Sequence, residues 1–184
     1  AALDALGGDG VVEITDNDQY AETIAIEVIA GGRVELRAAD GRRPSIVLAA
    51  ACRITGGVDG ECVLNGVLVS GAGLHVPAVA GNELGRLTIT HATLVPGLAL
   101  TPEGGAAQPG AASLTVETRG TRVRVMHAIV GPVLTPVGSE VEVESSIIDA
   151  TGKSEVALAA VDRVGPGGTL TLRGSTVVGK VHAQ

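Results

Sequence analysis

The stretch LTITHATLV, residues 87–95, decides the fold, because the chain repeats its pattern four more times. The pattern begins with alternating apolar and polar residues and continues with a bend residue, a small residue, a variable residue and an aliphatic one. Such alternation is typical of a strand that buries one face. The other copies read CVLNGVLVS at 62–70, VRVMHAIVG at 123–131, VEVESSIID at 141–149 and LTLRGSTVV at 170–178.

In the middle of each copy the alternation stalls for one residue. Glycine adopts a left-handed bend without steric cost, and histidine is among the residues enriched in that conformation. After the bend a small and then an aliphatic residue turn inward, which predicts a second short strand. Each copy is therefore expected to form two strands that meet at a corner. The corner residues are Gly66, His91, His127, Ser145 and Gly174.

Repeats of this size, none of which can bury its own apolar face, indicate a solenoid. The pattern resembles the strand-corner-strand element of the pectate-lyase-like parallel β-helices, with His or Ser where that group often has Asn. The resemblance covers nearly the whole chain and implies the fold of that group. We therefore expect an all-β, right-handed, single-stranded parallel β-helix of about seven turns, its hand following the rule for parallel crossovers.

Composition agrees with a narrow aliphatic coil in a single domain. The chain has 184 residues, of which 45% are hydrophobic but only 1% aromatic, so Val, Ile, Leu and Ala must fill the core. The net charge is −7 and no basic cluster extends beyond Arg42-Arg43, which argues against nucleic-acid binding. No apolar run approaches the length of a membrane-spanning helix.

Along the chain, residues 1–10 predict a short helical cap over the N-terminal end, and residues 11–184 the β-helix. Residues 101–122 are expected to form an inserted loop that contains one extra strand. No signal peptide is apparent, and the fold analogy favours an extracellular or cell-surface location. We expect a third strand in each turn of the coil, at 26–28, 52–54, 74–76, 98–100, 133–134, 156–158 and 181–182.

The outward residues of these third strands would form a row along the coil. At its start, Glu27, Arg53 and His75 could together bind or cleave an acidic sugar, or they could form a plain ladder of surface charges. The catalytic motifs of the lyases and hydrolases of this fold are absent, so the resemblance implies no catalytic residue. The row reads Glu27, Arg53, His75, Ala99, Leu134, Ala157 and His182.

Two sets of side chains raise the question of metal binding. His91 and His127 fall at equivalent corners and could share a metal ion or stack as a ladder of imidazoles. Asp16 and Asp18, together with Asp40, could hold Ca²⁺ or form a solvated turn. We expect no cofactor, with binding of Ca²⁺ by the aspartates left open.

Two further pairs occupy informative positions in the predicted strands. Cys52 and Cys62 point inward, which favours buried free thiols over a disulfide. Ile129 and Ile147 point outward on adjacent turns, where an apolar stripe would mark an interface unless the loop at 101–122 covers it.

Together these features favour a non-catalytic structural or scaffold module of a larger bacterial protein. The alternative is a carbohydrate-active or carbohydrate-binding module, a lyase or a hydrolase if catalytic, that acts on an acidic polysaccharide. The sequence ends without a recognisable cap, so we expect the C-terminal end of the coil to contact either the rest of a longer chain or a second copy.

Overall fold

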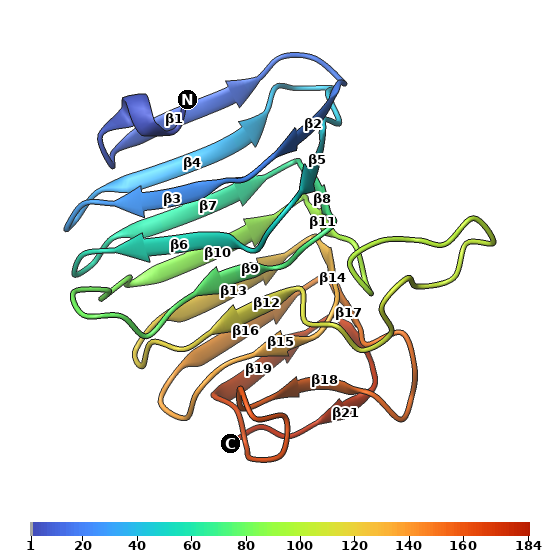
Figure 1. Ribbon diagram of the computed structural model, residues 1–184. Coiled ribbons are helices and arrows are strands. Elements are labelled where there is room, and N and C mark those ends of the chain that lie inside the picture. Colours follow the sequence, from blue (N-terminus) through green and yellow to red (C-terminus); the bar gives the residue numbers. More distant parts are fainter. Residues whose placement is uncertain (1) are drawn as a thin grey trace.

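The computed structural model describes residues 2–184 and shows a parallel β-solenoid. Three seven-stranded parallel sheets run the length of the coil, and every neighbour in a sheet is three strands away in the sequence (Figure 1). The chain therefore passes through sheets A, B and C once per turn and completes seven turns. The predicted fold class and number of turns are confirmed.

The strands have the following bounds. Sheet A contains β1 (Gly10–Ile14), β4 (Arg33–Ala38), β7 (Glu61–Asn65), β10 (Arg86–Thr90), β13 (Arg122–Met126), β16 (Glu140–Glu144) and β19 (Thr169–Arg173). Sheet B contains β2 (Gln19–Glu22), β5 (Ser45–Leu48), β8 (Leu68–Ser70), β11 (Thr93–Leu94), β14 (Ile129–Val130), β17 (Ile147–Asp149) and β20 (Thr176–Val178). Sheet C contains β3 (Ala25–Val28), β6 (Cys52–Gly56), β9 (Leu74–Val76), β12 (Leu114–Val116), β15 (Val133–Leu134), β18 (Val156–Ala159) and β21 (Lys180–Val181).

The corners between sheets A and B have the predicted left-handed backbone. His91, His127 and Ser145 have φ values of 49°, 50° and 48°, and the glycines at the same corner in other turns, Gly66 and Gly174, have 74° and 55°. This bend turns the chain between sheets while the alternation on either side keeps aliphatic residues inside. The inward positions on successive strands of sheet A stack in register as Leu36, Leu64, Ile89, Val125 and Val143, all buried.

Sheet C differs from the expectation in the fourth turn. Its strand there is β12, whereas the predicted strand at 98–100 lies in an excursion that leaves the coil after β11 and returns at β12. Leu100 is 64% exposed and forms only an isolated antiparallel bridge with Ala106. The prediction of a strand at 98–100 is therefore wrong. The excursion spans residues 95–113, before the third strand, rather than the 101–122 of the predicted loop, which includes a regular strand of the coil.

At the N-terminal end, the predicted helical cap is a single 3₁₀ turn, Asp4–Leu6. Leu3 and Leu6 pack against the first turns of the core. Residue 1, which belongs to the predicted cap, lies outside the described residues. Among residues 2–184, no helix is long and apolar enough to cross a lipid bilayer.

The two cysteines lie in the core as free thiols, as predicted. Cys52 is in β6 and Cys62 in β7. Burial raises the pKa of the Cys52 thiol to about 12. Burial, followed by the neighbouring Cys52 and Glu61, raises the pKa of Cys62 as well. Both thiols therefore act as small apolar core groups rather than as nucleophiles.

Candidate functional site

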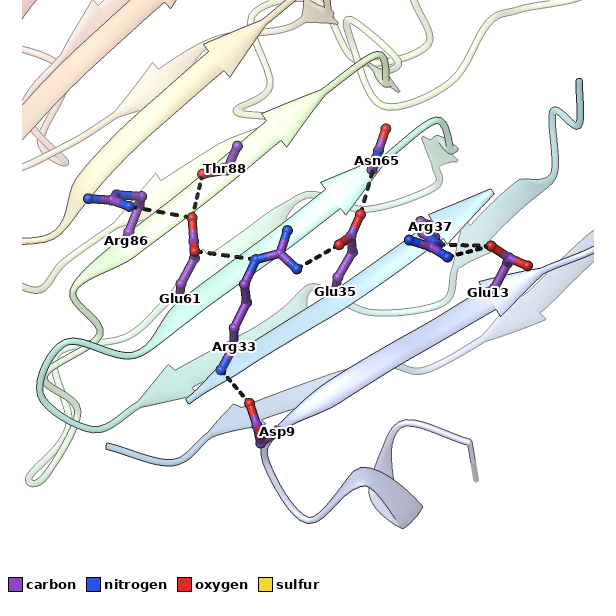
Figure 2. Close-up of polar contacts among 9 residues, drawn as sticks. All are labelled: Asp9, Glu13, Arg33, Glu35, Arg37, Glu61, Asn65, Arg86 and Thr88. Carbon is purple, nitrogen blue, oxygen red and sulfur yellow. Dashed lines mark hydrogen bonds and ion pairs between the residues drawn. The ribbon is translucent and has the colours of Figure 1, made fainter. Parts of the chain in front are cut away.

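The most organised polar surface of the molecule is the outer face of sheet A. Its outward positions carry charges that stack from turn to turn, because the register places Arg33 beside Glu61 and Glu61 beside Arg86. A guanidinium nitrogen of Arg33 lies 3.4 Å from Glu61, and Nη1 of Arg86 lies 3.7 Å from the same carboxylate (Figure 2). Between the first and second turns, Arg37 contacts Glu13 through two nitrogens, each at 2.8 Å. We call this surface the charged ladder.

Glu35 is the most enclosed charge of the ladder, with 5% of its surface exposed. Arg33 approaches it to 2.7 Å, and the side-chain amide of Asn65 donates a hydrogen bond to it at 3.1 Å (Figure 2). Burial alone would raise the pKa of this carboxyl group, but the hydrogen bonds from Asn65 and Arg33 outweigh it and hold the pKa below its usual value. Glu35 therefore depends on both Asn65 and Arg33 to stay ionised in this enclosed position.

The second half of the ladder lies on β13, β16 and β19. Nε of Arg122 lies 2.9 Å from Glu140, and Nε of Arg124 lies 2.8 Å from Glu142. Arg173 approaches the other oxygen of Glu142 at 3.8 Å. The hydrogen bond and charge of Arg124 hold the pKa of Glu142 below its usual value. The ladder was not predicted from the sequence, although its signal, Arg and Glu at the outward positions of alternating strands, is visible.

On sheet C, the structure brings together only part of the predicted row. Arg53 and His75 are register neighbours, as the predicted row requires. Glu27, however, is paired with Thr55, two residues beyond Arg53, its predicted neighbour. Glu27 and Arg53 still line one groove of about 470 Å³. His75 contacts Glu117 at 3.2 Å instead.

The rest of the row does not continue as predicted. Ala99 lies in the excursion, and Thr115 takes its place beside His75. Leu134 keeps the predicted place in the row, beside Thr115, although it is buried. Its neighbour in the next turn is Ala159 rather than Ala157, which lies in the core, and His182 follows the last strand. The prediction failed here because short strands of sheet C contain few residues by which to fix the inward and outward positions.

Glu117 is a functional candidate that the sequence did not indicate. Its carboxylate accepts a hydrogen bond from the backbone N–H of Ala78 at 2.9 Å and faces His75. The backbone hydrogen bond, followed by His75, holds the pKa of Glu117 below its usual value. A paired carboxylate and imidazole beside Arg53 give this end of sheet C a polar surface that could bind a ligand.

The predicted metal candidates have other partners. The rings of His91 and His127 are stacked, with centroids 5.0 Å apart and planes 12° from parallel, as the imidazole-ladder interpretation requires. Asp16 accepts hydrogen bonds from the Tyr20 hydroxyl at 2.7 Å and from the Asp18 backbone at 3.0 Å. Within the part of the chain that the structure describes, no three His, Cys, Asp or Glu side chains could hold a metal ion together.

Two other surfaces lie near the corner between sheets A and B. A groove of about 640 Å³ runs beside the corner between sheets A and B and is lined by Arg37, Arg43 and His91 among others, with Asp40 at its edge. Ile129 and Ile147 are register neighbours on sheet B and are 40% and 39% exposed. The excursion therefore does not cover them.

Comparison of the chain with protein-family models, with curated proteins and with solved structures finds no match. Any role for these surfaces therefore rests on the geometry of the chain itself.

Proposed function

We propose that this chain is a non-catalytic scaffold module, a stiff coil that assembles with a second copy through its C-terminal end. One observation carries the proposal, namely the exposure of apolar positions in the last turn. Leu172 is 44% exposed, whereas Val143, its register neighbour in the preceding turn, is 0% exposed. In the same way, Val181 is 41% exposed and its neighbour Leu158 is 0% exposed.

The backbone of the last turn adds to this argument. Strands β19, β20 and β21 each lie at the end of their sheet, so one edge of each presents backbone groups that a further strand can pair with. An apolar layer bordered by three such edges is the type of surface that stacking on another β-structure stabilises. At the opposite end, Leu3 and Leu6 pack over the first turns.

A second copy can cover the apolar layer of the last turn if the two copies meet through this same end. A two-fold axis would make their β19 strands antiparallel, and antiparallel pairing centred on Thr171 places Thr169 of one copy opposite Arg173 of the other. No two like charges then face each other on that strand. Closed two-fold assemblies are the commonest among soluble oligomers.

Two finer assignments belong to this proposal. The three-sheet cross-section and the left-handed corners support a place for the coil among the right-handed, pectate-lyase-like β-helices. The proposed role is that of a spacer or assembly part within a larger bacterial protein. Neither assignment adds a catalytic residue.

Sedimentation velocity over a concentration series tests the assembly. We expect a discrete dimer for the chain and a monomer for Leu172→Lys, because a charge cannot be buried in an apolar interface without a partner. Leu100→Lys is the matched control, since Leu100 is also exposed but lies in the excursion; it should leave the dimer intact. A monomer at every concentration, or equal loss of the dimer in both variants, would contradict the proposal. Turnover of a polysaccharide by this chain would contradict its non-catalytic part.

A second candidate function is binding of an acidic polysaccharide on sheet C. The observation that favours it is the groove shared by Glu27 and Arg53, with His75 and Glu117 beside it. Titration with oligouronates should show binding that Arg53→Ala abolishes. If the unmodified chain binds no member of a uronate panel, this candidate must be abandoned.

A further inference from the structure

The charged ladder contains one place where its charges do not alternate. Arg86 on β10 is the register neighbour of Arg122 on β13, and Arg124 lies two residues further along β13. These two strands carry three cations and no acidic residue. Like charges directly opposite each other on neighbouring strands are destabilising, so the arrangement costs stability unless an anion offsets it.

The guanidinium groups at this place are incompletely paired. Nε of Arg86 is buried and has no hydrogen-bond partner among the described residues, and the contact of Arg86 with Glu61, at 3.7 Å, is long. Arg122 and Arg124 use Nε to contact Glu140 and Glu142. Since a guanidinium group has five N–H donors, the terminal nitrogens of both remain available.

The three arginines line one groove of about 210 Å³. Val123 also lines the groove, and Glu140 and Glu142 contribute to its wall. Arginine is the side chain best suited to phosphate-like groups, because its planar fork donates two parallel hydrogen bonds. Neighbouring strands lie about 4.8 Å apart, so an anion between Arg86 and Arg122 needs oxygens that point in several directions. A tetrahedral oxyanion has them, whereas a planar carboxylate does not.

We propose that Arg86, Arg122 and Arg124 form a binding site for a sulfate or phosphate group. The anion lies between the guanidinium groups of β10 and β13, receives hydrogen bonds from both strands and removes the repulsion between Arg86 and Arg122. This site is independent of the proposed scaffold function and of the C-terminal end.

Isothermal titration with inorganic sulfate and phosphate, at low ionic strength, tests the site. We expect one site per chain, and at least tenfold weaker binding for Arg86→Gln combined with Arg122→Gln. Arg37→Gln is the matched control, because Arg37 lies on the same ladder but beside a carboxylate; it should bind as the unmodified chain does. Equal binding by all three proteins, or binding by none, would overturn the proposal.

Thermal unfolding gives a second readout that a purely structural role would not produce. Sulfate stabilises most proteins by exclusion from their surface, so only the difference from sodium chloride at equal ionic strength, compared among the variants, is informative. Arg86→Gln should gain less unfolding temperature from sulfate than the unmodified chain does, because it removes a donor to the bound anion. An undiminished gain in this variant would contradict the site.

The anion could be free or attached to a polymer, and a third experiment separates these sources. Dextran sulfate that binds at least tenfold more tightly per sulfate than the inorganic ion, with no binding of unsulfated dextran, would assign the site to a sulfated polysaccharide. Equal affinity per sulfate would assign it to the free anion.

Discussion

The sixth and seventh turns of the coil share one strand pattern but differ in burial. Strands β16 and β19 each have five residues, and β17 and β20 each have three. Yet the inward side chains are fully buried in the sixth turn and partly or largely exposed in the seventh. The register neighbours are Val143 and Leu172, Ile148 and Val177, and Leu158 and Val181.

The difference shows that a turn does not bury its own core. Each turn of a solenoid contacts only its neighbours, so its stability is a sum of small intrinsic terms and interface terms. A middle turn has two such interfaces, whereas the seventh has one within this chain.

The largest contrast is expected between two leucines in one inward column. Leu64 lies in the third turn and is 2% exposed, whereas Leu172 is 44% exposed. Leu64→Ala should lower the free energy of unfolding by about 2–5 kcal/mol, and Leu172→Ala by about 0.5 kcal/mol. Urea denaturation, at a concentration where sedimentation shows the monomer, measures both. Equal losses would show that the last turn is as well packed as the middle ones.

The corner glycines should show the same contrast on a smaller scale. A Cβ at Gly66 would lie 3.1 Å from the Cβ of Ala38, while a Cβ at Gly174 would meet nothing closer than 3.8 Å, at Oγ of Ser145. Both have positive φ values, so each substitution to Ala should cost about 1–2 kcal/mol of backbone strain. Gly66→Ala should lose more because of the added contact. Thermal unfolding measures the difference, and a larger loss for Gly174→Ala would contradict it.

The pH dependence of the free energy of unfolding should depend more on an enclosed carboxylate than on an exposed one. The pKa values of Glu35 and Glu142 are both held below the ordinary value of 4.5. Their contributions are therefore complete above that value and are lost as the pH falls through the lower, folded-state pKa. Glu35→Gln should cost about 1–3 kcal/mol at neutral pH and flatten the acid limb of the stability curve.

Glu142→Gln is the comparison, because the side chain of Glu142 is 29% exposed whereas that of Glu35 is 7% exposed. It should change the acid limb less, since solvent screens its ion pair. Denaturant midpoints measured across acidic pH provide the test. A steeper acid limb in Glu35→Gln than in the unmodified chain would reverse the assigned direction of the pKa shift.

A buried and an exposed thiol should differ clearly in the rate at which a thiol reagent modifies them. This comparison involves the smallest change in stability. Cys62 is 0% exposed, so a thiol reagent should modify it only as fast as the chain opens. Leu172→Cys should introduce a thiol that reacts at once in the folded protein. Rapid modification of Cys62 in the folded state would show that the middle turns open far more readily than their packing indicates.

The parts of the fold that were predictable from the sequence are fixed by two constraints, a bend residue and the alternation on either side of it. Sheets A and B flank a residue with left-handed backbone, and alternation before and after residues such as His91 and Ser145 leaves one register. Sheet C has no such marker. Both triplets, 98–100 and 114–116, have aliphatic residues at their first and third positions, and tertiary packing makes only the second a strand of the coil.

The candidate sites show the same limit. Arg53 and His75 were placed together correctly, but Glu27 was misplaced by two residues because the strand around it has no corner to fix the alignment. The arginines of the ladder were visible in the strands. Their like-charged contact was not predicted, although the stacking expected for His91 and His127 already implied that β10 and β13 are adjacent.

That excursion has a consequence for how such a chain can change over generations. Residues 95–113 leave sheet B after β11 and enter sheet C at β12, while β10 and β13 remain paired over all five residues. Chain length can therefore be gained or lost at this junction without altering the stacking of the turns, since the entropic cost of a longer loop grows only slowly with its length. A foreign peptide inserted between residues 103 and 104 should accordingly be displayed on an unchanged coil, which makes this junction the natural graft point of the molecule.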